Sequence, residues 1–129
     1  MASFVAQGET WRKLRGMGCL FCNILEKKVP ATVVYEDEHA LAFRDIRPMA
    51  PTHVLVIPKK HIAAIHDLEP GHAETVGQVL VAARRVADQE GVTKDGYRLV
   101  INDGDAAGQT VHHIHVHVLG GRTLSWPPG

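Results

Sequence analysis

Hydrophobic and polar residues alternate strictly over residues 113–118. Every second position from His113 to His117 is a histidine, and the residues between and after them are the β-branched Ile114, Val116 and Val118. Successive side chains of a β-strand point to opposite faces, so the pattern predicts a strand with imidazoles on one face and an apolar anchor on the other. A helix would bring His113 and His117 together and turn His115 away.

Shorter apolar runs predict the remaining elements. Four more strands are expected over residues 32–35, 40–44, 53–58 and 97–101, and the acidic turn 36–39 joins the first two in a hairpin. A short helix is expected over residues 19–28, ended by Pro30. A long helix is expected over residues 72–90, with an apolar stripe of period 3.6 and a glycine at its C-terminal cap: Val76, Val79, Leu80, Ala83, Val86, Ala87 and Gly91.

Strands in short hairpins, interrupted by one long helix, indicate an α+β fold with an antiparallel sheet. We expect one domain over residues 19–129, preceded by a flexible N-terminal extension over residues 1–18. Residues 1–16 are basic but contain no apolar core of a secretory signal, and no run approaches the roughly 20 apolar residues of a membrane span. The expected location is cytoplasmic, or an organelle if residues 1–16 are a targeting remnant.

The charge balance limits the partners. Lys plus Arg and Asp plus Glu number 14 each, so no overall field attracts nucleic acid or a membrane surface. A nucleotide-sized anion can still be bound locally. We therefore expect neither nucleic acid nor membrane as a partner.

The row of histidines favours chemistry near neutral pH, where imidazole titrates. Three neighbouring imidazoles cannot all be charged, so at least one keeps a free ring nitrogen, as a nucleophile or a zinc ligand requires. The alternative is a solvated polar face on an edge strand. Cys19 and Cys22 are spaced as a metal half-site or a redox pair, and their alternative is two small apolar residues on a short helix.

Residues 113–119 resemble the signature His-φ-His-φ-His-φ-φ of the histidine triad (HIT) superfamily. The ending, with residues 119–122 followed by 126–129, looks like the Hint branch, the purine nucleoside phosphoramidases. The similarity runs from about Cys19 to Gly129. It implies a five-stranded antiparallel sheet with one long helix and one short N-terminal helix, in a homodimer whose two sheets join.

The resemblance also implies an activity. A Hint-like enzyme cleaves the P–N bond of adenosine or other purine nucleoside 5'-phosphoramidates, such as AMP-lysine, and releases a nucleoside monophosphate and an amine. His115 would be the nucleophile and form a nucleotidyl-histidine intermediate, without a catalytic metal. His113 would orient it through a ring hydrogen bond, and His117 would donate to a phosphate oxygen. His53 matches the fourth histidine of the family's site.

The nucleotide-binding residues implied by the resemblance include Asp45, which would accept from both ribose hydroxyls. Ile46, Phe21, Phe43 and Leu55 match apolar positions beside the purine, although a place in the core is the simpler interpretation of Phe43 and Leu55. Asn102, Gly108, Gln109 and Thr110 match positions near ribose and phosphate, together with His115 and His117. Thr110 stands where the branch more often has serine. Trp126 would contact the partner subunit. The expected ligand is AMP, GMP or a phosphoramidate.

Two questions stay open at this point. Some HIT proteins hold a structural zinc through residues placed like Cys19, Cys22, His61 and His113, while many relatives lack the metal. A dinucleotide polyphosphate hydrolase of the Fhit-like branch is compatible with residues 109–111, but the Trp126 ending disfavours it. A non-catalytic nucleotide- or zinc-binding interaction module is the third reading.

Overall fold

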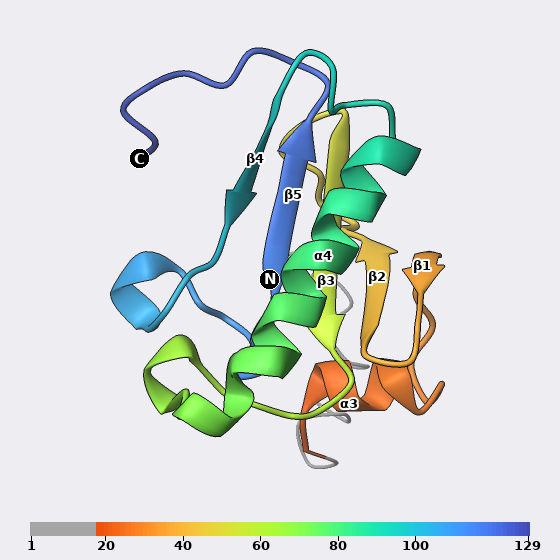
Figure 1. Ribbon diagram of the computed structural model, residues 1–129, viewed down its shortest axis with the longest axis vertical. Coiled ribbons are helices and arrows are strands. Elements are labelled where there is room, and N and C mark those ends of the chain that lie inside the picture. Colours follow the sequence, from red (N-terminus) through yellow and green to blue (C-terminus); the bar gives the residue numbers. More distant parts are fainter. Residues whose placement is uncertain (1–17) are drawn as a thin grey trace.

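The computed structural model describes residues 18–129, and a five-stranded antiparallel sheet lies at its centre (Figure 1). The strand order is β1-β2-β3-β5-β4. The strands are β1 (Val33–Glu36), β2 (Ala40–Arg44), β3 (Thr52–Pro58), β4 (Tyr97–Val100) and β5 (Val116–Gly120). The predicted α+β class with five antiparallel strands is confirmed. The expectations for residues 1–17 lie outside the described residues.

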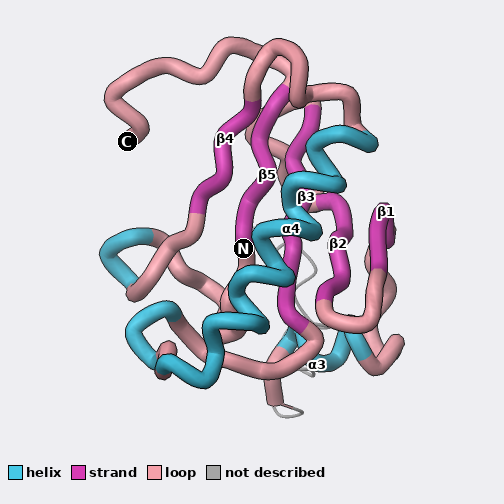
Figure 2. Tube along the Cα trace, in the orientation of Figure 1, coloured by secondary structure: helices cyan, strands magenta, loops and turns pink. Residues whose placement is uncertain are grey.

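Helices lie on both faces of the sheet (Figure 2). The long helix α4 (Ala73–Gln89) packs against one face, and the short helix α3 (Leu20–Leu25) lies on the other. Short 3-10 helices occur in the connections: η1 (Ile65–Asp67), η2 (Pro70–His72) and η3 (Asp105–Ala107). Over residues 18–129, no helix is both long and apolar enough to cross a membrane.

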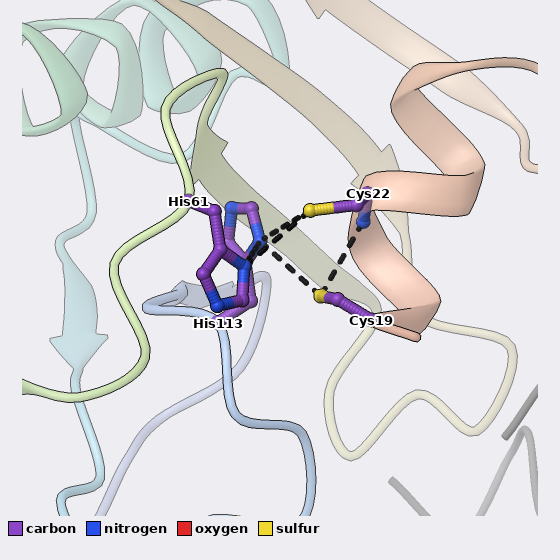
Figure 3. A group of neighbouring side chains, drawn as sticks. All are labelled: Cys19, Cys22, His61 and His113. Carbon is purple, nitrogen blue, oxygen red and sulfur yellow. Dashed lines mark hydrogen bonds between the residues drawn. The ribbon is translucent and has the colours of Figure 1, made fainter. Parts of the chain in front are cut away.

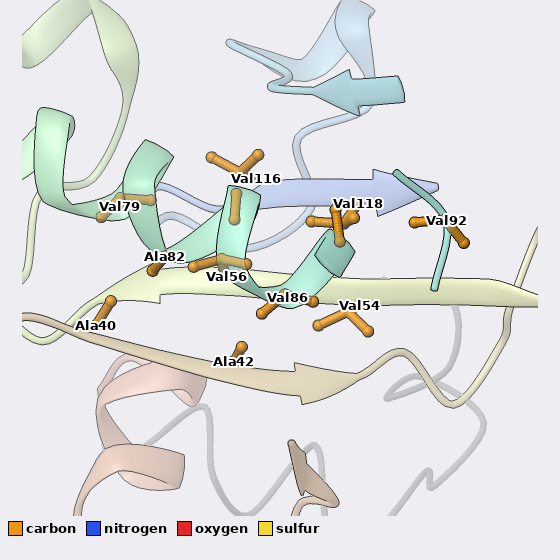
Figure 4. Packing of buried hydrophobic residues seen from close by; sticks show 12 residues of the cluster. Ala40, Ala42, Val54, Val56, Val79, Ala82, Val86, Val92, Val116 and Val118 are labelled. Atoms are coloured by element: carbon orange, nitrogen blue, oxygen red, sulfur yellow. The ribbon is translucent and has the colours of Figure 1, made fainter. Parts of the chain in front are cut away.

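Strand β3 is buried along its whole length because it has neighbours on both faces. Val54 and Val56 face α4, where small side chains let the helix approach the sheet closely (Figure 4). Leu55 and Ile57 face α3 on the opposite side. Burial on both faces explains the continuous apolar run of the strand. On the neighbouring strand β5, His117 pairs with Leu55, so His117 also faces α3.

Helix α4 ends as predicted. Gly91 adopts φ +74°, and its N–H donates to Asp88 O at 3.1 Å, which is the left-handed cap that glycine allows. The predicted apolar stripe needs one correction. Leu80 is 40% exposed, and Ala82 is buried in the core instead. Leu80 lines a small apolar hollow with Ile101, the residue that follows β4, and a part of its surface remains in solvent.

The strand predicted over the histidine triad is shorter than expected. Strand β5 begins at Val116, so His113 and His115 precede it. The register pairs Val56 with Val116, which would place Pro58 opposite Ile114, and proline has no N–H for the ladder. The Ile114 N–H donates instead to Ile62 O at 2.8 Å. Triad histidines therefore sit partly on a strand and partly on the extended segment that leads into it.

Candidate active site and metal centre

His115 is the middle histidine of the triad, and its ring has one fixed nitrogen. The backbone carbonyl of His113 accepts from Nδ1–H at 2.8 Å. A neutral imidazole has one N–H, so Nε2 carries the lone pair. Burial lowers the pKa of His115, which is 3% exposed, and keeps this ring neutral near pH 7. The result is an oriented nitrogen nucleophile.

The expected ring hydrogen bond from His113 to His115 is not present. The peptide carbonyl of His113 orients His115, while the His113 ring points elsewhere and donates from Nε2 to Pro58 O at 2.9 Å. The physical reason is that the extended segment turns the His113 carbonyl toward residue 115. His113 therefore serves the site through its backbone.

His117 and His53 form a directional pair on neighbouring strands β5 and β3. The Met49 N–H donates to His53 Nδ1 at 3.0 Å, so neutral His53 carries its proton on Nε2. That nitrogen lies 2.9 Å from His117 Nδ1, which must accept. Neutral His117 then carries its proton on Nε2, a buried atom with no hydrogen-bond partner among the described residues. A buried, unpaired donor beside a nucleophile is suited to a phosphoryl oxygen or a leaving group.

The electrostatic environment keeps this pair uncharged. Burial lowers the pKa of His117 to about 4, and the neighbouring His115 and His53 add to the effect. Burial also lowers the pKa of His53, against the opposing carboxylate of Asp45. Asp45 is 7% exposed, and its Oδ2 lies 3.5 Å from His53 Nε2, while Oδ1 accepts from the Arg47 N–H.

Phe21, on α3, packs against the histidines from the sheet's α3 face. Its ring contacts His115 edge-on, with centroids 5.2 Å apart, and Phe43 at 5.4 Å. Phe21, Phe43 and Leu55 have no exposed surface, whereas Ile46 is 47% exposed. Burial supports a backing role for the first three, and their direct contact with a purine stays a prediction.

The loop before the triad is held from inside by Gln109. Its side chain accepts from the Gly104 N–H and donates to Ala63 O and Val111 O. The backbone N–H groups of Gly108 and Gln109 are already bonded within the loop, so those two do not face a ligand as expected. Farther along the described loop, the N–H groups of Thr110, Val111 and His112 have no backbone acceptor, and Thr110 is exposed.

A second contact holds this loop, and sequence reasoning missed it. His66 Nδ1 lies 2.6 Å from Asp103 Oδ1, and the carboxylate raises the pKa of His66. The pair ties η1 to the loop that begins at half-buried Asn102. Nothing in the spacing of the two residues could have indicated it, because 37 positions separate them.

The side chains of Cys19, Cys22, His61 and His113 gather beside α3 (Figure 3). Helix α3 brings the two thiols together, because the Cys22 N–H donates to Cys19 Sγ at the helix N-cap. All four ligand atoms lie within 4.8 Å of one another. His113 Nε2–H donates to Pro58 O, so the ring directs its Nδ1 lone pair into the group.

The spacing of this cluster fits tetrahedral zinc. Nitrogen and sulfur ligands at about 2.0–2.3 Å from the metal would lie about 3.3–3.8 Å from one another. His113 Nδ1 lies 3.4 Å from Cys19 Sγ, 3.6 Å from Cys22 Sγ and 3.1 Å from His61 Nδ1. The donor set of a structural zinc site consists of two thiols and two imidazoles, as in this cluster. The Pro58 carbonyl would orient one of the imidazoles from outside the set. The predicted ligand set is thus brought together.

Trp126 lies beyond β5 and is 80% exposed. The Arg98 side chain holds this C-terminal segment, donating to Ser125 O at 3.0 Å and stacking 5.9 Å from the Trp126 ring centre. Such a large exposed ring is consistent with the expected contact to a partner subunit, which stays a prediction.

Comparison with known proteins agrees with this geometry. The HIT domain family matches residues 26–124. The chain belongs to the HIT family. A "14 kDa zinc-binding protein" of Zea mays is 52% identical over 120 residues, covering 92% of this chain and 93% of the relative. A HIT family hydrolase from Legionella pneumophila superposes with a TM-score of 0.85 at 54% identity, covering 87% of this HIT protein and all of that chain (100%).

Two further solved structures bear on ligands. A Zn-bound histidine triad family protein from Mycobacterium smegmatis is 43% identical with a TM-score of 0.73, covering 83% of this chain and 77% of that one. A histidine triad nucleotide-binding protein from Candida albicans is 28% identical with a TM-score of 0.72, covering 85% and 83%. Bound zinc and nucleotide binding are properties that these names give to the two related proteins.

Proposed function

We propose that this HIT protein hydrolyses the P–N bond of purine nucleoside 5'-phosphoramidates, as a Hint-like enzyme. The observation that carries the proposal is the pairing of two ring nitrogens. His115 Nε2 has a lone pair, because Nδ1–H is held by a carbonyl, and nearby His117 Nε2–H is buried without a partner within residues 18–129. The ring centres of these histidines are 5.1 Å apart, so one phosphoryl group could contact both nitrogens.

The reaction follows from these roles. The His115 Nε2 lone pair attacks the α-phosphorus while the P–N bond breaks, and the leaving nitrogen takes one proton from solvent through the Thr110 hydroxyl, a proton that the attacking water of the second step returns to solvent. His117 Nε2–H donates to a phosphoryl oxygen, and the Thr110 hydroxyl donates to the α-phosphate or the bridging nitrogen. Water then attacks the nucleotidyl-histidine, which releases the monophosphate and restores neutral His115. No metal takes part in these steps.

Other residues would bind the nucleotide. The free N–H groups of residues 110–112 suit phosphate oxygens, since backbone donors at a bend form an anion-binding concavity. Asp45 Oδ2 has His53 Nε2, 3.5 Å away, as its nearest N–H donor among the described residues. This carboxylate oxygen can therefore accept from ribose hydroxyls. Exposed Ile46 offers an apolar surface to the purine, and Asn102 would bind on the ribose side.

The test is the His115→Ala variant. We expect turnover of adenosine 5'-phosphoramidate to fall by about 10⁴-fold or more, because the attacking atom is gone. AMP should still bind by calorimetry, since the other contacts remain. His39→Ala is the matched control, because His39 lies on the β1–β2 turn beside Glu38. Turnover retained by His115→Ala overturns the assignment.

The same assay separates the alternatives. Diadenosine polyphosphate is supplied in parallel with the phosphoramidate at equal concentration. Faster cleavage of the dinucleotide indicates a Fhit-like hydrolase. Nucleotide binding without turnover of either compound indicates an interaction module. Each result contradicts the phosphoramidase proposal in a different way.

We also propose that the cluster of Cys19, Cys22, His61 and His113 holds one structural zinc. Its support is the tetrahedral spacing, together with the names of two relatives. Elemental analysis should give one zinc per chain, and cobalt substitution should give the visible bands of a tetrahedral sulfur–nitrogen site. Cys22→Ser should lose both. A metal content that is unchanged in this variant would rule the site out.

A homodimer is the third part of the proposal. Strand β4 is an edge of the sheet, and apolar side chains near it are exposed: Leu80 40%, Leu99 37% and Ile101 37%. An apolar edge of this kind favours pairing with a second copy. Sedimentation should give twice the chain mass, reduced to the single mass by Leu80→Glu. Val33→Glu, on the opposite edge strand β1, is the control.

A further inference from the structure

The segment that ends β5 contains an arginine to which the proposed mechanism assigns no role. Arg122 follows Gly120 and Gly121, two positions beyond the end of β5 and five positions after His117. Its guanidinium donates to Met49 O through Nη2 at 2.9 Å and Nε at 3.3 Å. Nη1 donates to Thr123 O at 3.0 Å, which anchors the side chain. This arginine therefore makes three hydrogen bonds although it is exposed.

Met49 connects Arg122 to the histidines. The Met49 carbonyl accepts from Arg122, and the Met49 N–H donates to His53 Nδ1 at 3.0 Å. That N–H is what places the His53 proton on Nε2, and hence the His117 proton on its own Nε2. Met49 itself is 70% exposed, and among the described residues its carbonyl accepts only from Arg122. Arg122 therefore holds the Met49–Ala50 peptide, which joins the Pro48–Met49 N–H at the Met49 Cα.

The two glycines explain how Arg122 reaches Met49. Gly121 adopts φ +88°, and a Cβ there would lie 2.9 Å from Pro51 Cβ. A Cβ on Gly120 would lie 2.8 Å from Val92 Cβ. The chain can therefore turn back over the loop that contains Met49 and Pro51 only without side chains at these positions. The turn brings the guanidinium against the loop.

We propose that Arg122 is a positioning residue that fixes the protonated nitrogen of His117 through Met49 and His53. The inference rests on the proposed function, in which His117 Nε2–H faces the phosphoryl group. Removing the guanidinium frees the Met49–Ala50 peptide and so loosens the Met49 backbone. The adjoining Pro48–Met49 N–H can then leave His53 Nδ1, and His53 can place its proton on either nitrogen. His117 then loses its obligatory partner on Nδ1, and a part of the molecules present a lone pair where the reaction needs a donor.

The test combines spectroscopy with kinetics on the full-length chain. Nitrogen NMR of labelled imidazoles distinguishes the two neutral forms of each histidine. In the unmodified protein, His53 and His117 should both carry the proton on Nε2. In Arg122→Met, both should become mixtures, and kcat should fall by about tenfold with little change in KM, because positioning rather than binding is lost.

Matched variants complete the design. Arg122→Lys keeps one charged donor and should restore part of the kcat and of the Nε2–H form. Arg84→Met removes a guanidinium paired with Asp88 on the surface of α4 and should change neither readout. If Arg122→Met is unstable, the imidazole spectra and kcat of Arg122→Lys and Arg122→Gln are compared with those of the unmodified protein instead. Unchanged imidazole spectra in these variants overturn the proposal, even when kcat falls.

The spectroscopic result does not depend on the substrate. If the unmodified protein fails to cleave phosphoramidates, the proposed function fails, while the imidazole spectra still decide whether Arg122 sets the proton positions. A kcat within about twofold of the unmodified value, together with mixed imidazole forms, shows that the proton position is not limiting and overturns the catalytic half of the inference.

Discussion

Two histidine groups lie on the α3 face of the sheet within residues 18–129, one fully buried and one that includes exposed His61, and they differ in where their lone pairs point. In the cysteine cluster, the Nδ1 lone pair of His113 points toward a common point with two sulfurs and His61. In the pair of His53 and His117, each lone pair accepts from a donor, and the last N–H remains free. Convergent lone pairs suit a metal, while a directed chain suits proton donation.

Backbone groups cause this difference. The Pro58 carbonyl fixes one ring nitrogen of His113, and the Met49 N–H fixes one of His53. A carbonyl forces the ring nitrogen beside it to carry the proton, and an N–H forces it to accept. Identical side chains on one face of the sheet thus receive opposite tasks, and each task can be removed separately.

Of the changes that separate these two groups, His117→Ala should have the largest effect. Loss of the free Nε2–H should lower kcat for the phosphoramidate by about 10²–10³-fold, the usual loss for one preorganised donor. Zinc content should stay at the level of the unmodified protein, because His117 is not in the metal cluster. Steady-state kinetics and elemental analysis check both halves. A simultaneous loss of zinc would contradict the separation of the two groups.

The second effect is from His113→Ala, in the other group. The variant loses a zinc ligand, and the melting temperature should fall by about 10 °C, as expected when a tightly bound structural ligand is lost. The peptide carbonyl that orients His115 remains, so kcat at 25 °C should fall by less than about tenfold. Scanning calorimetry with and without a chelator measures the first part. A chelator should not lower the variant's melting temperature further.

A smaller effect is expected from Asp45→Asn. The amide has one fewer acceptor, so the preference for a ribose over a 2'-deoxyribose substrate should fall by about tenfold in kcat/KM. The zinc cluster does not include this residue, so melting in the presence of a chelator should shift as in the unmodified protein. An unchanged sugar preference would place the ribose elsewhere.

The smallest effect is on the pH dependence of stability. Burial lowers the pKa of His117 from 6.5 to about 4, so the unfolded chain binds this proton first as the pH falls. Stability from this group is complete above about pH 6.5 and decreases toward pH 4, by roughly 1 kcal/mol between pH 7 and pH 5.5. Urea unfolding at several pH values should show a weaker decline in His117→Ala. An equal slope in both proteins would mean that His117 is not buried as a neutral ring.

Much of the fold was predictable because the burial pattern matches the period of each element. The alternation around His117 predicted which side chains of β5 share a face, and the apolar stripe predicted the buried side of α4. Gly91 predicted where that helix ends. The start of β5 was predicted too early, because Pro58 ends the ladder on the neighbouring strand. Only the register shows which residue lies opposite that proline.

The site was predictable in its residues and less so in its connections. The spacing of the triad and of the two cysteines indicated a part of each group, and the family resemblance added His53 and His61. The structure brings together Cys19, Cys22, His61 and His113 as expected. The roles of the His113, Pro58 and Met49 peptides could not be predicted, because every residue has the same backbone groups. Gln109 was expected to face the nucleotide and is instead used inside its loop.

The Gly120–Gly121 pair has a consequence for anyone engineering this protein. A library randomised at both positions and selected for turnover should return almost only glycine, since Val92 and Pro51 occupy the space that any larger residue would need. Variation intended to alter the choice of amine therefore belongs at Thr110 or in the tail beyond Arg122, where neighbouring side chains leave room for change.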